Sequence, residues 1–65
     1  MTLYKYLHFK DNYIKSEEVA VIAFDGTTPK LIVRLKGVMI SDYFDISTED
    51  LNLVREQWEK YIKGE

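Results

Sequence analysis

Two stretches of the sequence decide the fold: Val19-Ala20-Val21-Ile22-Ala23-Phe24 and Leu31-Ile32-Val33-Arg34-Leu35. Both are runs of β-branched and aromatic residues, which favour strands. The residues between them, Asp25-Gly26-Thr27-Thr28-Pro29-Lys30, tolerate turn geometry. Gly37 then permits a reversal into a third alternating run, Val38 to Phe44. We therefore expect an antiparallel sheet with strands at about residues 19–24, 31–36 and 38–44.

Alternation along each run predicts which side chains share a face. Leu31, Val33 and Leu35 fall on one face of their strand. The run 19–24 is apolar on both sides, with Val19, Val21 and Ala23 opposite the other three residues, so we expect this strand to be covered on both faces. Alternation leaves the orientation of residues 38–44 open. We expect the bulkier set to face the helix, and this set is Val38, Ile40 and Phe44.

The two ends of the chain predict a further strand and a helix. Residues 2–9 alternate as a strand, Lys10-Asp11-Asn12 supplies a turn, and Tyr13-Ile14-Lys15 forms a short return. Ser47 is a good N-cap for a helix over about residues 48–63. An apolar stripe at helical spacing follows, formed by Leu51, Val54, Trp58, Tyr61 and Ile62. The sequence thus predicts an α+β domain, residues 1–65, with a small antiparallel sheet of three to four strands and one C-terminal helix on one face.

The composition points to association. The chain has 65 residues, no cysteine and nine aromatic residues. A domain of this size buries only about 60% of its unfolded surface, so a second source of stability is expected. One helix covers one face of the sheet and leaves the other face to water or to a partner. We expect a homodimer or a protein partner to bind through four apolar side chains: Ile32, Met39, Tyr43 and Leu53.

The charge of the chain is distributed unevenly. Residues 1–40 carry a net charge of +2 and residues 41–65 a net charge of −4. Asp42, Asp45 and Glu49 form an acidic rim where the last strand passes into the helix, which would complement a basic partner surface. Their spacing is not that of a calcium-binding EF-hand loop, and helix capping accounts for Asp50. We therefore expect no metal and no cofactor.

Catalysis and membrane insertion receive no support from the sequence. His8 is the only histidine, and no nucleophile motif surrounds any of the serines, so we expect a protein that is not an enzyme. No apolar run approaches the roughly 20 residues of a membrane span, and the N-terminus lacks a signal-peptide pattern, so we expect a cytoplasmic protein with no membrane partner.

The N-terminal strand supplies the alternative function. Rings and positive charge interleave on one of its faces, as in platforms that bind single-stranded nucleic acid, through Tyr4, Tyr6, His8 and Lys10. The acidic balance of the whole chain argues against this function. A small regulatory protein that binds single strands remains the alternative to a protein-binding protein.

The order of elements also supports a resemblance. The turn Phe9-Lys10-Asp11-Asn12-Tyr13-Ile14 precedes the two apolar strands, and Ile46-Ser47-Thr48-Glu49 opens the final helix. This layout resembles the FlbD-like proteins, and it is similar to small phage anti-defence proteins such as antagonists of the Hachiman system. The resemblance implies a protein encoded by a phage or mobile element. It also implies inhibition of a larger host protein, such as a defence helicase or nuclease, by direct binding.

Overall fold

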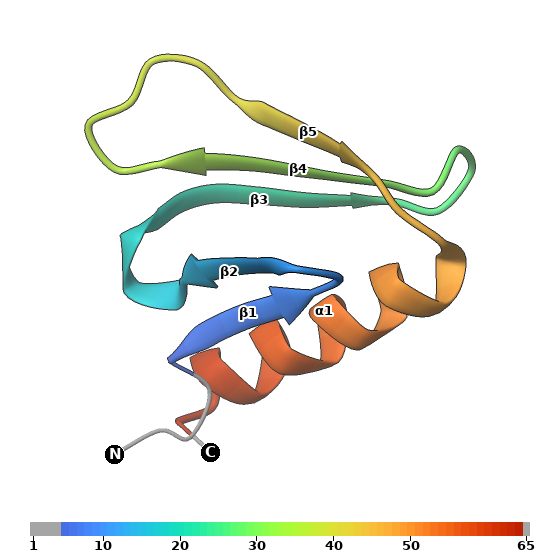
Figure 1. The fold of residues 1–65 in the computed structure, drawn as a ribbon. Coiled ribbons are helices and arrows are strands. Elements are labelled where there is room, and N and C mark those ends of the chain that lie inside the picture. The colour runs from blue at the N-terminus through green and yellow to red at the C-terminus, as the bar shows by residue number, and fades with distance from the viewer. Residues whose placement is uncertain (1–4, 65) are drawn as a thin grey trace.

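The computed structural model describes residues 5–64, which form two antiparallel sheets and one helix (Figure 1). The first sheet pairs β1 (Tyr6–Phe9) with β2 (Asn12–Lys15). A short 3₁₀ turn, η1 (Ser16–Glu18), leads to the second sheet. This sheet has the order β3 (Val19–Asp25), β4 (Lys30–Leu35), β5 (Asp42–Asp45), and α1 (Thr48–Ile62) ends the chain. The predicted α+β architecture is confirmed.

The N-terminal strand and its return form a separate hairpin. The loop between β1 and β2 is Lys10-Asp11, and Lys10 adopts the left-handed φ of 52° that closes it. Leu7 and Phe9 are buried, while Tyr6 and His8 on the opposite face are exposed. The strand predicted over residues 2–9 is described from Tyr6 onward. Tyr4, a residue of the alternative nucleic-acid face, lies outside the described residues.

A β-bulge in β3 changes the predicted faces of this strand. Val19 pairs with Leu35, but Val21 pairs with Arg34, so Ala20 is an extra residue in the ladder. The alternation reverses at this point, and Val19 shares the core-facing side with Ile22 and Phe24. The predicted grouping of Val19 with Val21 is therefore wrong. The prediction that both faces of this strand are covered is also wrong within residues 5–64, because Val21 is 45% exposed.

The third predicted strand of this sheet is shorter than residues 38–44. Pairing covers only Asp42–Asp45, and Phe44 lies opposite Leu31. If pairing began directly at Val38, the tight turn would bring Asp42 opposite the buried Leu31. The observed register places Phe44 there instead, with its ring packed edge-on against Phe9 at 5.2 Å between centroids. Residues 36–41 therefore form a loop outside the sheet. Val38 and Ile40 lie in this loop and are exposed, so they do not face the helix as predicted.

The helix confirms most of the prediction for the C-terminal residues. The hydroxyl oxygen of Ser47 accepts a hydrogen bond from the Asp50 amide at 3.1 Å, as expected of an N-cap. Leu51 and Val54 are buried, and Trp58 packs against the core. Ile62, which belongs to the predicted stripe, is 62% exposed, so the stripe does not remain covered through the last turn.

One hydrophobic core joins the two sheets and the helix. Its buried residues come from β1, β3, β4, the segment before the helix and α1: Leu7, Phe9, Val19, Leu31, Val33, Ile46, Leu51 and Val54. Figure 1 shows α1 running below the strands, with the hairpin between it and the three-stranded sheet. We call the side of the β3–β4–β5 sheet that points away from this core its outer face. No other element within residues 5–64 covers that face.

Candidate protein-binding surface

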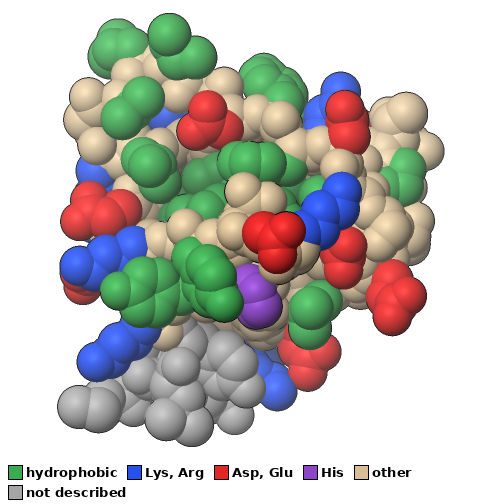
Figure 2. All heavy atoms as spheres, in the orientation of Figure 1, with side chains coloured by type: hydrophobic (Ala, Val, Ile, Leu, Met, Phe, Trp, Pro, Cys, Tyr) green, Lys and Arg blue, Asp and Glu red, His purple; other side chains and the backbone are tan. Residues whose placement is uncertain are grey.

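The loop between β4 and β5 carries the most exposed apolar side chains of the described chain. Met39 is 91% exposed and Ile40 75%, and Val38 is also exposed. Gly37, at a φ of 77°, forms the turn that starts the loop, and the Val38 amide donates to the Leu35 carbonyl at 3.2 Å. Figure 2 shows hydrophobic side chains gathered at this upper corner of the molecule. The loop thus presents three consecutive apolar residues to solvent.

The outer face of the sheet continues this apolar surface. Ile32 lies in the middle strand, directly between Ala23 and Tyr43 of the neighbouring strands. Tyr43 is 65% exposed, and the Lys30 ammonium lies 5.9 Å from the centroid of its ring. Arg34 on the same face donates to the Val38 carbonyl at 3.4 Å, which connects the sheet to the loop. We name this surface the apolar patch and define it by Ile32, Val38, Met39, Ile40 and Tyr43.

The structure brings together three of the four predicted association residues. Ile32, Met39 and Tyr43 all belong to the apolar patch. Leu53 does not, because it lies on α1 beside Tyr6 and His8 of β1, where these residues border a depression of about 300 Å³. Leu53 is therefore separate from the apolar patch, and its part in association stays a prediction. The sequence did not identify Val38 and Ile40 as residues of this surface. The one signal for them is the preference of Phe44 over Asp42 for the core position opposite Leu31.

The three acidic residues of the predicted rim lie on β5 and at the start of α1, and only Asp45 shares the outer face with Ile32 and Tyr43. Asp42 and Asp45 occupy the two ends of β5 and are exposed, and Glu49 is exposed in the first turn of α1. Asp45 pairs across the sheet with Lys30. Within residues 5–64, the structure gives no salt bridge to Asp42, Asp45 or Glu49. These carboxylates are therefore available to a basic partner surface.

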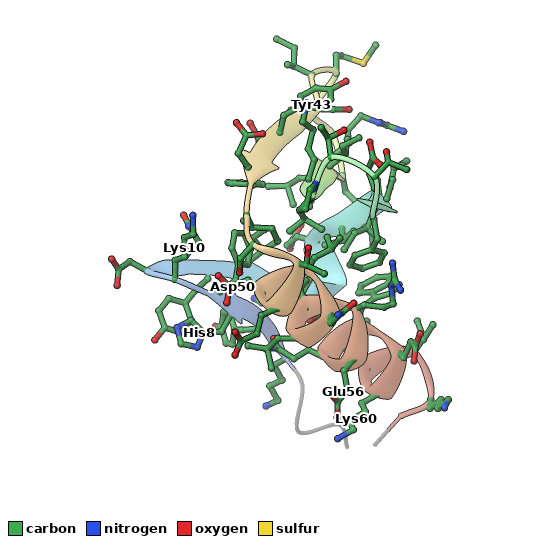
Figure 3. The ribbon with its side chains drawn as sticks, turned by 90° about the vertical axis from the view of Figure 1, so that its right-hand side faces the viewer. His8, Lys10, Tyr43, Asp50, Glu56 and Lys60 are labelled. Atoms are coloured by element: carbon green, nitrogen blue, oxygen red, sulfur yellow. The ribbon has the colours of Figure 1, made fainter. Side chains whose placement is uncertain are left out.

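The hairpin presents a second exposed surface, distant from the first. Tyr6, His8, Tyr13 and Lys15 share one face of the hairpin. The rings of His8 and Tyr13 stack at 4.3 Å between centroids, with an interplanar angle of 5°. Figure 3 shows His8 and Lys10 on the hairpin, well separated from Tyr43. The structure thus places Tyr6 and His8 of the alternative nucleic-acid face on one surface, whereas Lys10 lies in the adjoining turn.

Both lysines of the hairpin already have partners within the chain. The Lys10 ammonium donates to the Asp45 carbonyl at 3.2 Å. The Lys15 ammonium lies 3.1 Å from the Glu17 carboxylate, and the hydrogen bond and negative charge of Glu17 raise the pKa of Lys15. The His8 ring nitrogen Nε2 lies 3.1 Å from the Lys10 carbonyl, an acceptor, so this nitrogen is the donor. Glu17 offsets the positive charge of Lys15, and the contact with β5 holds the Lys10 ammonium at the Asp45 carbonyl, so both lysines are less available to a nucleic acid.

The described residues give little support for a metal site or a membrane-spanning helix. Within residues 5–64, no group of three histidine, cysteine, aspartate or glutamate side chains could hold a metal ion. A second depression, of about 410 Å³, lies between the hairpin and the end of α1, and its lining includes Tyr6, Glu17 and Tyr61. In the same part of the chain, α1 has 15 residues, and no helix is long and apolar enough to span a membrane.

Comparison of the chain with protein-family models, curated proteins and solved structures finds no match in any of the three.

Proposed function

We propose that the chain is a protein-binding protein that uses the apolar patch. The exposure of Val38, Met39 and Ile40 on one loop is the observation that carries this proposal. A contiguous exposed apolar surface with a charged border is typical of protein-interaction sites. Tyrosine and methionine are also enriched in such interfaces. Asp45 on the outer face, with the exposed Asp42 and Glu49 on β5 and α1, favours a partner whose contact surface is basic.

The specific form of the proposal is inhibition of a larger host protein. A protein encoded by a phage or mobile element can inhibit a defence helicase or nuclease by covering its surface, without any reacting group. The apolar patch supplies affinity for such a function, and the acidic rim supplies electrostatic complementarity to the basic surface with which these enzymes bind nucleic acid. We also propose that the chain forms a homodimer, which the mass of the purified protein in solution tests.

Binding of single-stranded nucleic acid is the alternative. The shared face of Tyr6, His8 and Tyr13 supports it, while the engagement of Lys10 and Lys15 within the chain weakens it. A nucleic-acid complex of this kind would retard a labelled single strand at low salt and dissociate steeply as salt rises.

Affinity capture with matched variants tests the proposal. Wild-type protein, a loop variant (Val38→Ser, Met39→Ser and Ile40→Ser) and a hairpin control (Tyr6→Ser and Tyr13→Ser) are used as baits in bacterial lysate. All changes are at exposed positions, and thermal melts verify that the three baits fold. We expect one protein to be retained by wild type and control and lost by the loop variant. Equal retention by all three baits, or recovery of nucleic acid that depends on the hairpin, would contradict the proposal.

The inhibitory form has a separate test. The retained protein is purified and its ATPase or nuclease activity measured while the chain is titrated to saturation. We expect the activity to fall in proportion to the fraction bound. Unchanged activity at saturation would refute inhibition and leave protein binding in place.

A further inference from the structure

The outer edges of β1 and β5 differ in how their main-chain groups are hydrogen-bonded. At the edge of β1, the Gln57 side chain accepts a hydrogen bond from the His8 amide at 2.8 Å and donates to the His8 carbonyl at 3.1 Å. A side-chain amide thus occupies the place of a neighbouring strand. At the edge of β5, the corresponding contact within residues 5–64 is the single hydrogen bond from the Lys10 ammonium to the Asp45 carbonyl. β5 is the last strand of its sheet and remains largely open.

The register identifies the main-chain groups on the open side of β5. The Ile46 amide donates to the Pro29 carbonyl at 3.3 Å, and the same register places Phe44 opposite Leu31 and Asp42 opposite Val33. Since hydrogen-bonded and non-hydrogen-bonded pairs alternate in an antiparallel ladder, Phe44 and Asp42 bond to β4. Tyr43 and Asp45 therefore direct their amide and carbonyl groups outward. The contact of Lys10 with the Asp45 carbonyl independently agrees with this direction.

The charges along this edge define what can pair with it. Asp42 and Asp45 lie at the two ends of β5 on opposite faces of the sheet, and the aromatic residues Tyr43 and Phe44 lie between them. β4 shows part of this complement, because Lys30 lies opposite Asp45, and Leu31 and Ile32 lie opposite the two rings. Val33 lies opposite Asp42, so β4 supplies no cation at that end of the strand. A strand added on the other side meets the same four residues.

We infer that β5 binds an extended basic segment of the partner as a fourth strand, with cations opposite Asp45 and Asp42 and two apolar residues between them. In an antiparallel segment these cations occupy positions i and i+3. Tyr43 contributes its amide and carbonyl, and Asp45 contributes its amide, to the new ladder. The inference rests on the proposed function and specifies the chemistry of the partner. The adjoining apolar loop would contact residues of the partner beyond this segment.

A second copy of β5 complements this edge poorly. Pairing of two β5 strands gathers four carboxylates, from Asp42 and Asp45 of each copy, on strands that contain no basic side chain. Like charges on adjacent strands destabilise their pairing. A basic segment neutralises both carboxylates instead, so the edge selects a different partner over itself.

A peptide titration followed by amide NMR tests the inference. The probe is acetyl-Thr-Lys-Val-Val-Lys-Thr-amide, added to isotope-labelled protein. We expect the largest shift changes at the amides of Tyr43 and Asp45. Two matched peptides serve as controls: one with both lysines replaced by glutamate, and one with an N-methyl group on the second valine, which lies opposite Tyr43. Each control should bind at least about tenfold more weakly, because the first reverses the charges and the second removes a main-chain donor.

A pair of protein variants provides the reciprocal test. Tyr43→Pro removes the outward amide without removing a hydrogen bond to β4, and proline is tolerated at such edge positions. Tyr43→Val keeps the amide and removes only the ring. We expect Tyr43→Pro to weaken the peptide complex at least about tenfold relative to Tyr43→Val. If Tyr43→Pro does not fold, the N-methylated peptide alone decides.

Three results would overturn the inference: shift changes away from β5, equal binding of the N-methylated and unmodified peptides, or the same β5 shifts produced by raising the protein concentration without peptide. The last result would identify a second copy as the occupant. If the loop variant still loses its partner in the capture experiment while the peptide fails to bind β5, the proposed function stands and strand addition is refuted.

Discussion

The side chain of Gln57 in α1 and the main chain of His8 in β1 form a reciprocal pair of hydrogen bonds, at 2.8 and 3.1 Å. The two residues are 49 positions apart in the sequence. Through this pair, the helix completes the hydrogen bonding of the hairpin edge and fixes its own position relative to β1. The contact links the part of the fold that the sequence predicts best, the helix, to a hairpin whose packing it does not predict.

Replacement of Gln57 by alanine tests this link. The two hydrogen bonds are exposed, so water replaces part of what is lost, and we expect Gln57→Ala to lower the free energy of unfolding by about 1–2 kcal/mol. Urea denaturation measures the loss, and hydrogen exchange of the His8 amide should accelerate. Asn52→Ala, which removes another exposed amide from the same helix, should change the stability by less than about 0.5 kcal/mol. Unchanged exchange at His8 would contradict the pairing.

The backbone of Lys10 gives a second prediction. Its φ of 52° is unfavourable for a residue with a Cβ atom. Lys10→Gly and Lys10→Ala both remove the ammonium contact with Asp45, but only glycine adopts this φ without strain. We expect the glycine variant to be more stable than the alanine variant by about 1 kcal/mol in chemical denaturation. Equal stability of the two variants would contradict the left-handed conformation.

The N-cap of the helix is tested at Ser47. Ser47→Ala removes the acceptor for the Asp50 amide and should lower the free energy of unfolding by about 1 kcal/mol. Ser47→Asp keeps an acceptor and should retain most of the stability. Thermal denaturation followed by circular dichroism compares both variants with wild type. A loss of similar size in both would show that the hydroxyl does not act as a cap.

The turn between β3 and β4 makes the acid stability of the protein depend on Asp25. The Thr27 hydroxyl and amide donate to its carboxylate at 2.6 and 3.0 Å and lower the pKa of Asp25. Because the folded pKa is the lower one, the stabilisation is present above the unfolded value of about 4 and is lost as pH falls through the folded value. Asp25→Asn should remove this part of the pH dependence of stability.

Carboxyl NMR measures the same effect directly. We expect Thr27→Ala to raise the pKa of Asp25, because the hydroxyl contact is the largest cause of the lowered value. Thr28→Ala should leave it unchanged, since the contribution of Thr28 comes from its main chain. An unaltered Asp25 pKa in Thr27→Ala would refute the hydroxyl contact.

Local patterns in the sequence were sufficient to predict the helix and the existence of the strands. Ser47 and the spacing of Leu51 and Val54 depend on residues within one or two turns, and the structure confirms all three roles. The bulge at Ala20 could not be predicted from alternation, because it depends on which β4 residue each β3 residue meets. Alternation also could not predict that residues 38–41 form a loop. Their conformation depends on the register of β5, in which Phe44 and not Asp42 takes the core position opposite Leu31.

The candidate site was predictable only in part, for the same reason. Ile32 and Tyr43 share the outer face because they are directly paired. Alternation separates Ile32 from Leu31 and Val33, but it left the orientation of Tyr43 open. Leu53 is 47% exposed, as an association residue must be, but its location beside β1 depends on how the helix crosses the hairpin. The two contacts of Gln57 with His8 are part of that crossing, and no sequence pattern around Gln57 reveals them.

Site-specific photocrosslinking in cells tests most directly whether the apolar patch is the binding surface. Benzoylphenylalanine is placed singly at Met39, Tyr43, Tyr6 or Tyr13, all of which are exposed, so the fold is not disturbed. If the apolar patch binds a protein, irradiation should link positions 39 and 43 to one protein species and leave positions 6 and 13 unlinked. Crosslinks to protein or nucleic acid that arise from positions 6 and 13 instead would contradict the central claim and assign function to the hairpin.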